Sequence, residues 1–192
     1  MIVKGHDFSR VTLVGVLLAD LTLFSGDYRA GERTFDLLTQ AAGRAGRGDV
    51  PGKVVIQTYK PDNYAITAAA SQDYRAFYDI EEAYRSLMRY PPEWNMMVIM
   101  GTGMDEEQLA NIMDRMYSLI RGKYINAGHL SVIGPSEPAI SKIKDVYRRV
   151  LYIKHRDYRM LVDVKDYVEE WLKENGENDV SVFFDLNPVN MY

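Results

Sequence analysis

Two arginines at the end of a predicted helix are the residues of this chain best suited to chemistry. Arg44 and Arg47 stand in the stretch Thr39–Gly52, TQAAGRAGRGDVPG, and each of them follows a glycine. A guanidinium group binds phosphate oxygens through its planar fork and keeps its charge when water is removed. Because the glycines add no bulk, both arginines can approach one phosphate. Gln40, one turn earlier, can orient a water molecule or a phosphate oxygen from the same face.

The same residues have a structural interpretation that involves no chemistry. Basic residues in the last turn of a helix favour its negative end, by about 0.3–1 kcal/mol each. A glycine directly after a helix is equally routine. A phosphoryl-transfer site, by contrast, needs positive groups at the γ-phosphate, where charge develops in the transition state. The local sequence leaves both interpretations open.

A family resemblance favours the phosphoryl-transfer interpretation. The pattern Q-x-x-G-R-x-G-R resembles the last conserved motif of superfamily 2 helicases, and here it comprises Gln40, Gly43, Arg44, Gly46 and Arg47. The stretches KGHDFSRVTLVGVLLAD, LFSGDYRAGERTFDLLTQAAGRAGRG and GKVVIQTYKPDNYAI resemble the primosomal protein N′ (PriA) family of replication-restart helicases. RYPP, VIGPSEPAISKIKDVYRRVLYIK and FDLNP resemble the C-terminal domain of that family, so the likeness covers essentially the whole chain.

The resemblance implies roles for individual residues. Arg47 looks like the arginine finger, and Arg44 looks like a companion that contacts phosphate or aligns the lobe. Gln40 looks like the third member of the same catalytic group. Gly43 and Gly46 belong to the same nucleotide-contacting motif.

A second implied motif lies at the start of the chain. Gly5, His6 and Asp7 fall in what resembles motif V, which in this family couples the nucleotide state to the DNA track, with Gly5 and Asp7 on the nucleotide side. Tyr28 and the arginines at 29 and 33 precede the arginine motif, where they either pack the lobe or touch DNA.

The resemblance also implies cofactors that this chain cannot hold alone. The complete enzyme would be an ATP-dependent 3′→5′ DNA helicase that restarts stalled replication forks, with ATP and Mg²⁺ as cofactors and zinc bound elsewhere. This chain has no cysteine and only three scattered histidines, so no metal site is expected in it. Gly48–Lys53 (GDVPGK) is not a phosphate-binding loop, because its glycines are too close and no Ser or Thr follows the lysine. We therefore expect that this part alone hydrolyses no ATP.

A local basic cluster is the candidate surface for nucleic acid. The net charge is −4, so any such surface must be local. The hypothesis is that the DNA or partner contacts come from Lys142, Lys144, Arg148, Arg149 and Lys154. The alternative is an ordinary solvated face of a strand and turn. The family implies branched or forked DNA, the acidic-hydrophobic tail of the single-stranded DNA-binding protein and other primosome proteins as partners, and phosphate contacts would make DNA affinity fall with salt.

Three aromatic residues near this cluster are interpreted as structural. Tyr152, Phe183 and Phe184 can stack on bases, but aromatic residues on a half-buried sheet belong more often to the core. If the glycine-arginine run is only a helix end, the chain is instead a non-enzymatic nucleic-acid or protein adaptor.

The first half of the chain reads as part of an α/β unit. Strands are predicted at Val11–Leu17 and Lys53–Tyr59, with a loop at Phe24 and a helix from Arg29 to about Gly43 between them. Helical spacing continues from Tyr64 to Tyr90 and stops at a Pro-Pro pair. Two strands are few for a parallel sheet, so we expect the last part of a larger α/β unit and a chain that is a C-terminal part of something longer. The family resemblance implies that this unit is a RecA-like helicase lobe.

The second half has the order βαββαβ of the split ferredoxin-like fold. Its strands are predicted at Trp94–Met100, His129–Gly134, Tyr147–Lys154 and Val180–Leu186, and its helices at Asp105–Arg121 and Asp157–Asn175. The predicted organisation is lobe 2 with motifs V and VI at 1–62, a connecting helix at 63–92 and an α+β domain at 93–192. No signal peptide or membrane segment is recognisable, so a cytoplasmic location is expected.

Overall fold

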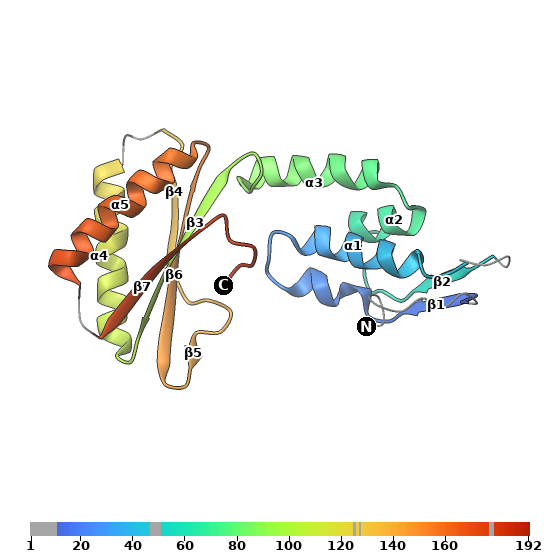
Figure 1. Cartoon of the computed structure of the whole chain (residues 1–192), viewed down its shortest axis with the longest axis horizontal. Helices are drawn as coiled ribbons and strands as arrows, with labels where there is room; N and C mark the ends of the chain where they lie inside the picture. Colours follow the sequence, from blue (N-terminus) through green and yellow to red (C-terminus); the bar gives the residue numbers. More distant parts are fainter. Residues whose placement is uncertain (1–10, 47–50, 125, 127, 177–178) are drawn as a thin grey trace. The chain divides into compact units, whose positions relative to one another are not determined.

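The structure, a computed structural model, describes residues 11–46, 51–124, 126, 128–176 and 179–192. Its internal contacts divide the chain into two compact units, Met1–Tyr84 and Arg85–Tyr192. Both units contain helices and strands (Figure 1), so the predicted mixed α/β class is confirmed.

The first unit is built on a parallel pair of strands, β1 (Leu13–Val16) and β2 (Lys53–Ile56). Parallel strands need a crossover connection, and α1 (Ala30–Ala42) supplies it. β1 gives way to a 3₁₀-helix, η1 (Ala19–Phe24), because Leu18 adopts left-handed backbone with φ 52°. Part of the predicted loop before α1 is therefore helical.

Both strands are shorter than the sequence predicts, although pairing continues at their ends. The backbone N–H of Lys53 donates to the carbonyl of Thr12 at 2.8 Å, and that of Gln57 donates to Val16 at 2.8 Å. The residues beyond these bonds turn away into η1 and the loop after β2. Burial alternates along each strand, as expected for a sheet with one covered face.

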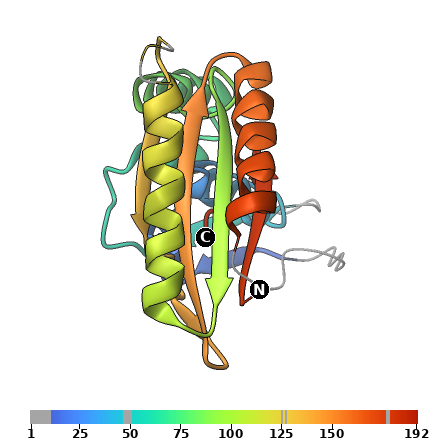
Figure 2. The same ribbon diagram turned by 90° about the vertical axis from the view of Figure 1, so that its left-hand side faces the viewer.

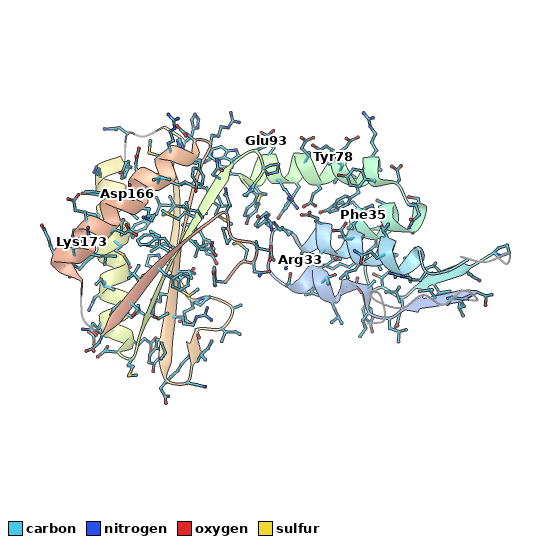
Figure 3. All side chains as sticks on the ribbon, in the orientation of Figure 1. Arg33, Phe35, Tyr78, Glu93, Asp166 and Lys173 are labelled. Atoms are coloured by element: carbon cyan, nitrogen blue, oxygen red, sulfur yellow. The ribbon has the colours of Figure 1, made fainter. Side chains whose placement is uncertain are left out.

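The core of the first unit is small and aromatic. Phe35 of α1 stacks on Phe77 with ring centroids 4.3 Å apart, and Figure 3 shows Phe35 in the interior of this unit. The buried residues around this pair are Ala19, Leu38, Ala65, Ile66, Ala68 and Ala69. Burying one Phe side chain contributes about 1.5–3 kcal/mol, so this pair matters to a small core.

The predicted helical stretch from Tyr64 to Tyr90 is two helices, α2 (Tyr64–Ser71) and α3 (Tyr74–Met88). Gln72 ends α2 in the left-handed conformation, with φ 56°. The Asp73 carboxylate then accepts the backbone N–H of Ala76 at 2.9 Å and starts α3. The helical spacing of apolar residues continues across this break, so in the sequence only the Gln72-Asp73 pair indicates that one helix ends and another begins.

The second unit is an antiparallel sheet with the order β4-β6-β3-β7. β3 (Asn95–Gly103) lies between β6 (Val146–His155) and β7 (Val180–Leu186). β4 (Ser131–Ser136) lies on the other side of β6, which also pairs with the short β5 (Lys142–Ile143). The predicted strands are confirmed within a few residues, whereas β5 was not predicted.

Two helices, α4 (Glu106–Tyr124) and α5 (Tyr158–Asn175), lie on the same side of this sheet (Figure 2). The predicted helices at Asp105–Arg121 and Asp157–Asn175 are confirmed. Asp157 begins α5 by accepting the backbone N–H of Arg159 at 2.9 Å. The core between helices and sheet consists of Met97, Ile99, Leu109, Ile112, Met113, Met116, Ile120, Leu151, Ile153, Leu161, Val164 and Val168.

Strand alternation gives the sheet a second face, on the side away from α4 and α5. Val98, Met100 and Val150 are buried there, with Tyr152 and Tyr192 packed against them. The hydroxyl of Tyr152 donates to the carbonyl of Tyr192 at 3.1 Å, and the Tyr192 hydroxyl donates to Asp185 at 2.7 Å. The interpretation of Tyr152 as a structural residue agrees with these contacts.

Candidate functional site

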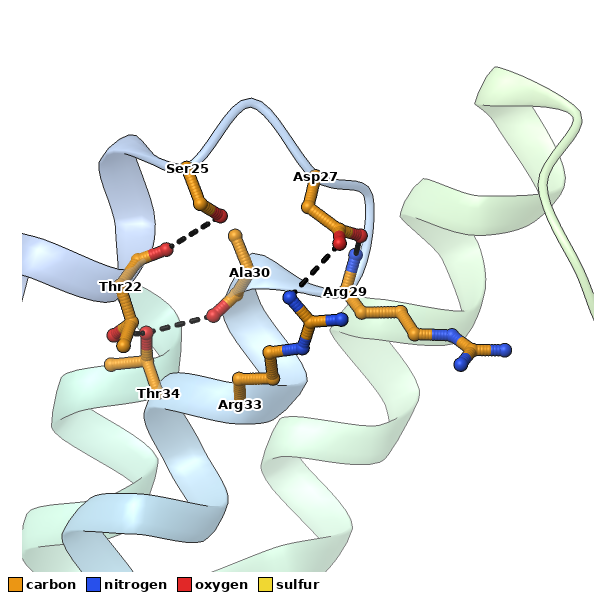
Figure 4. Close-up of polar contacts among 7 residues, drawn as sticks. All are labelled: Thr22, Ser25, Asp27, Arg29, Ala30, Arg33 and Thr34. Carbon is orange, nitrogen blue, oxygen red and sulfur yellow. Dashed lines mark hydrogen bonds and ion pairs between the residues drawn. The ribbon is translucent and has the colours of Figure 1, made fainter. Parts of the chain in front are cut away.

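The start of α1 is held by one carboxylate, that of Asp27 (Figure 4). It accepts the backbone N–H of Arg29 at 2.9 Å and forms an ion pair with Nη1 of Arg33 at 2.9 Å. The backbone N–H of Ala30 donates to the Asp27 carbonyl at 2.9 Å. A negative charge here also favours the positive end of the helix dipole. The stretch DYRAGER therefore fixes where α1 begins.

A pair of threonines joins η1 to α1 in the same region (Figure 4). The hydroxyl of Thr34 donates to the carbonyl of Ala30 at 2.7 Å. Its single proton is then used, so the Thr22 hydroxyl donates across the 2.5 Å contact to Thr34. Tyr28 is buried at 4% exposure, and the Arg29 guanidinium lies 5.2 Å from the centre of its ring. These contacts are those of a packed helix start.

The end of α1 is closed by a tight turn. Backbone N–H groups of Gly43, Arg44 and Ala45 donate to the carbonyls of the last helical turn at 3.0–3.1 Å. The next N–H, that of Gly46, leaves the helix and donates to the carbonyl of Val11 at 3.0 Å. The turn is therefore fixed to the residues just before β1.

Only glycine fits at two positions of this turn. Gly46 has φ +73°, a conformation that strains other residues. A Cβ on Gly46 would lie 2.7 Å from the backbone nitrogen of Gly52, and a Cβ on Gly52 would lie 2.3 Å from that of Gly46. The two backbone segments thus approach each other too closely for any side chain.

The structure brings part of the predicted catalytic group together. Gln40 and the glycines at 43 and 46 are exposed, and Arg44 is half-buried, all on the last turn of α1 and the residues that follow. The arginine at 47 and the residues Gly5, His6 and Asp7 lie outside the described residues. The roles assigned to all of them stay predictions.

Sequence reasoning missed a buried carboxylate at the other end of the strands. Asp20 is 2% exposed, accepts the Thr58 hydroxyl at 2.6 Å and accepts the Tyr59 backbone N–H at 2.8 Å. The hydrogen bond from Thr58, followed by that from Tyr59, lowers the pKa of Asp20. The available signal was a single acid directly after the apolar run VTLVGVLLA. This carboxylate ties the segment after β1 to the segment after β2.

The basic cluster of the second unit does not lie on one face. Arg148 and Arg149 are neighbours on β6, so their side chains point to opposite sides of the sheet. Arg149 lies on the helix side and approaches Glu106 of α4 at 3.8 Å. Arg148 lies on the side away from α4 and α5, where it donates to the carbonyl of Ile140 at 3.1 Å and to the Met100 sulfur at 3.3 Å.

Two further lysines join Arg148 near β5. Lys142 is exposed, pairs with Asp145 at 3.3 Å and lies 3.3 Å from the Tyr147 hydroxyl. The bond to Tyr147, with that to Asp145, raises the pKa of Lys142. Lys144 is exposed at the tip of the hairpin with φ 47°. These basic residues gather at one end of β6.

Lys154 lies at the other end of β6, about 20 Å from Arg148 at the usual strand rise. It is 5% exposed, donates to the carbonyl of Met88 at 3.1 Å and lies 3.4 Å from the centre of the Tyr90 ring. Burial, and then the positive charge of Arg89, lowers its pKa to about 8. Its surroundings are those of a buried structural lysine.

Neither a metal-binding group nor a membrane-spanning helix occurs in the described ranges. There, no group of three or more His, Cys, Asp and Glu residues could hold a metal ion. No helix in that part of the chain has the length and apolar character needed to cross a membrane.

Comparison with known proteins identifies the family. The family described as the primosomal protein N C-terminal domain matches residues 86–189, which is more than half of the chain. The chain belongs to this family. The match covers nearly all of the second unit, from the end of α3 to the residues after β7.

Several curated relatives of this primosomal protein N family member match the whole chain. Replication restart protein PriA of Bacillus subtilis is 38% identical over 100% of this chain and 24% of its own length. The protein of the same name from Synechocystis is 31% identical over 100% of this chain and 22% of its own length. The one from Chlamydia trachomatis is 34% identical over 100% of this chain and 25% of its own length. The chain thus spans about a quarter of the length of these relatives. The resemblance predicted from the motifs is confirmed.

Among solved structures, the de novo designed protein Foldit4 aligns with 48% of the chain and 97% of its own, at 17% identity and a TM-score of 0.36. This likeness is too weak to bear on the fold of the primosomal protein N domain. The predicted division at 1–62, 63–92 and 93–192 stays a prediction.

Proposed function

We propose that this chain is the C-terminal part of an ATP-dependent 3′→5′ DNA helicase that restarts stalled replication forks. The support is its membership of the primosomal protein N family and the relatives named replication restart protein PriA, which align with it from end to end. Helicase and ATPase activity belong to the longer protein in this proposal. The 192 residues contribute the end of one motor lobe and a DNA- or partner-binding domain.

The first unit is, in this proposal, the end of a RecA-like lobe. A parallel strand-helix-strand unit suits that role, and parallel sheets are normally covered on both faces. Here Leu13 and Val55, on the side of the strands away from the core, are 61% and 49% exposed, and Leu17 is 75% exposed. Such apolar exposure fits a sheet whose second face is covered by other parts of the longer protein. The second unit is, in the same proposal, a ferredoxin-like domain, which its strand order β4-β6-β3-β7 and its two helices on one face (Figure 2) support.

The single observation that carries the motor proposal is the turn after α1. Gln40, Gly43, Arg44 and Gly46 lie together there, and the Gly46 hydrogen bond to Val11 fixes the turn to the residues just before β1. In the complete enzyme Arg44 would contact phosphate or align the lobe, Arg47 would act as the arginine finger for the γ-phosphate, and Gln40 would orient a water molecule or a phosphate oxygen. Glycine at 43 and 46 leaves the approach open.

ATP with Mg²⁺, when bound, supplies the phosphoryl group and most of the charge neutralisation in the site. The exposed Gln40 and the half-buried Arg44 are compatible with a ligand that reaches them from outside this chain. Motif V, with Gly5 and Asp7, transmits the nucleotide state to the DNA track. Zinc belongs to another part of the longer protein.

Replacement of Arg47 tests the proposed motor role. Arg47→Ala in the complete enzyme should abolish unwinding and DNA-stimulated ATP hydrolysis, because loss of an arginine finger costs about 10³–10⁵ in rate. Affinity for forked DNA should change little. Arg75→Ala, on the exposed side of α3, is the matched control and should keep full activity. Unwinding by Arg47→Ala at the rate of the control would refute the assignment.

The second unit is proposed to bind forked DNA, the tail of the single-stranded DNA-binding protein or other primosome proteins. Lys142, Lys144 and Arg148 form the proposed surface because they gather at one end of β6, where the two lysines are exposed and Arg148 is half-buried. Arg149 faces the helix side and Lys154 is buried, so both should matter less. Titrations of forked DNA and of the tail peptide at two salt concentrations test this. Charge reversal at Arg148 should weaken binding and flatten the salt dependence, whereas reversal at Arg149 should have the smaller effect.

A further inference from the structure

Trp94 lies at the end of the second unit's sheet where β3 begins and β6 ends. Its neighbour Asn95 is paired with His155, the last residue of β6. The side-chain amide of Asn95 donates to the carbonyl of Arg156 at 2.8 Å, so Trp94 and Arg156 are held side by side just beyond the paired residues. Trp94 is buried, at 5% exposure.

Two arginines, Arg89 and Arg156, lie against the indole of Trp94 and are called the arginine pair below. The guanidinium carbon of Arg89 is 5.0 Å from the centre of the indole ring, and that of Arg156 is 5.4 Å from it. Because both contact one ring, the two guanidinium carbons lie within about 10 Å of each other. Both arginines are exposed. Stacking uses the flat face of a guanidinium, so its in-plane N–H donors stay available to a ligand.

The charge of the arginine pair is not balanced by acids of the described residues. Among these residues no ion pair joins Arg89 or Arg156 to a carboxylate. The Asp157 carboxylate is used at the start of α5, where it accepts the backbone N–H of Arg159. Glu93, labelled in Figure 3, is exposed. Two like charges held close together attract an anion that contacts both.

The end of α3 holds Arg89 in place. Arg89 has left-handed backbone, with φ 58°, and its N–H donates to the carbonyl of Ser86 at 3.3 Å. The next N–H, that of Tyr90, donates to the carbonyl of Arg85 at 2.8 Å. Glycine or asparagine is usual at such a helix end, so an arginine there indicates that its side chain is needed. Because the contact with Trp94 already orders this side chain, less conformational entropy is lost when a ligand binds.

The surroundings of Trp94 limit the contacts that a ligand can make. His129 packs edge-on against the indole, with ring centres 6.4 Å apart and ring planes at 82°. Because the indole is covered, it cannot stack on a nucleic-acid base. Lys154 is also buried, and its ammonium donates to the carbonyl of Met88. The groups left for a ligand are therefore the N–H donors of the arginine pair.

Phosphate is the anion that these donors fit. A guanidinium binds phosphate oxygens through two parallel N–H bonds. Every nucleotide of a DNA strand carries a phosphate, so one strand supplies an anion to each member of the arginine pair. Contacts to phosphate position DNA but do not read its sequence. The covered indole agrees with such a site, because nothing there contacts a base.

Arg156 and Arg148 mark the two ends of one strand. Alternate residues of a strand point to the same face, so Arg156, one residue beyond β6, continues the row of Arg148 and Tyr152 on the side away from α4 and α5. Arg148 and Arg156 are eight residues apart, which is about 26 Å at the usual strand rise. A DNA duplex covers this distance with about eight base pairs. One duplex is therefore long enough to contact both ends of β6.

We infer that Arg89 and Arg156, stacked on Trp94, form a phosphate-contact site through which the second unit binds the backbone of duplex DNA. The inference rests on the proposed DNA binding of this unit, but it assigns contacts to residues outside the surface of Lys142, Lys144 and Arg148. The site contributes affinity without sequence preference.

Arg89→Gln and Arg156→Gln test the site, because each removes one phosphate contact. Loss of one contact lowers the slope of log affinity against log salt by about 0.9, so each variant should bind a labelled duplex of about twenty base pairs roughly eightfold more weakly at 0.1 M salt and about equally at 1 M. Arg115→Gln is the matched control. Arg115 is exposed and stacks on Trp171 at 4.9 Å, but it bonds to Asn175, so its loss should leave the slope unchanged. Near-ultraviolet circular dichroism checks that each variant is folded.

Arginine modification by phenylglyoxal, read by peptide mass spectrometry, tests the wild-type chain without any substitution. Saturating duplex should slow the modification of Arg89 and Arg156 and leave that of Arg115 unchanged. Wild-type slopes in both glutamine variants, with binding still weakened by charge reversal at Arg148, would overturn the inference and leave the proposed DNA surface standing. No binding of duplex by the wild type would contradict both. Protection of the arginine pair by a polyglutamate peptide, but not by duplex, would assign the site to an acidic protein and so reject the inference.

Discussion

Replacing Lys154 by methionine should remove a pH-dependent cost from the second unit. The pKa of this lysine falls from 10.5 to about 8 on folding, because burial and then Arg89 disfavour the charged form. Below pH 8 both states carry the proton, and the shift corresponds to about 3 kcal/mol against the folded state. Between pH 8 and 10.5 the unfolded chain binds more protons than the folded one, so stability rises with pH.

The size of the effect follows from these two pKa values. The cost is about 3 kcal/mol at pH 7 and about 1 kcal/mol at pH 9.5, so wild type should gain about 2 kcal/mol relative to Lys154→Met over this interval. The hydrogen bond to Met88 and the contact with Tyr90 set the absolute difference at pH 7, but they do not alter this slope. Both tryptophans, Trp94 and Trp171, lie in the second unit, so tryptophan fluorescence in urea reports on the relevant unfolding.

Lys173→Met is the matched control, because Lys173 is exposed on α5. The free energy of unfolding of Lys173→Met should change with pH in the same way as that of wild type between pH 7 and 9.5. Because all three proteins contain the same tyrosines, the comparison also removes the contribution of tyrosine titration. A parallel curve for Lys154→Met would show that the Lys154 ammonium is not desolvated and would refute the reasoning. Forked-DNA affinity should be the same for Lys154→Met and wild type, since a buried lysine cannot reach a phosphate.

Three other outcomes are expected. Gly46→Ala should destabilise the first unit by about 1–3 kcal/mol, because φ is positive at Gly46 and the added methyl group would meet the Gly52 backbone. Gly122→Ala, whose added methyl group meets nothing within 4 Å, should instead stabilise α4 by up to about 1 kcal/mol. Thermal melting followed by far-ultraviolet circular dichroism measures both changes. Asp20→Ala should lower the melting temperature of the first unit at pH 7. Because folding lowers the pKa of Asp20, the difference in melting temperature between wild type and Asp20→Ala should close as the pH falls below 3.8. Asp62→Ala, at an exposed position, is the control and should show no such trend. The purified 192-residue chain should release no phosphate from ATP with or without forked DNA, and DNA-stimulated release above a no-protein blank would contradict the division of labour proposed here.

Local pattern was sufficient to predict most elements of the second unit. Its strands are continuous β-branched and apolar runs, and its helices carry an apolar row with Asp157 at one start, so periodicity and capping agree. The break at Gln72 was missed because the apolar spacing on its two sides happens to be in phase. β5 was missed because two residues carry no periodicity, and they pair only because β6 extends beside them.

The candidate site was less predictable, because side-chain surroundings depend on contacts distant in the sequence. Lys154 and Arg148 look alike in the basic stretch, yet the first is covered by residues from before β3 and the second lies near β5. Arg149 was grouped with Arg148 by adjacency, although strand geometry sends neighbours to opposite faces. The glycines at 43 and 46 were predicted from the motif, but the approach of Gly52 to Gly46 needed coordinates.

The bond from Lys154 to the carbonyl of Met88 joins residues 66 positions apart. Chains are synthesised from the N-terminus, and a ribosome adds about 5–20 residues per second. The Phe35–Phe77 core can therefore close while β6 has not yet been made, whereas the last turn of α3 must wait several seconds for its partner. During this interval the end of α3 in the nascent chain would lack the hydrogen bond from Lys154. A pause in translation between Arg89 and Lys154 should lengthen the interval.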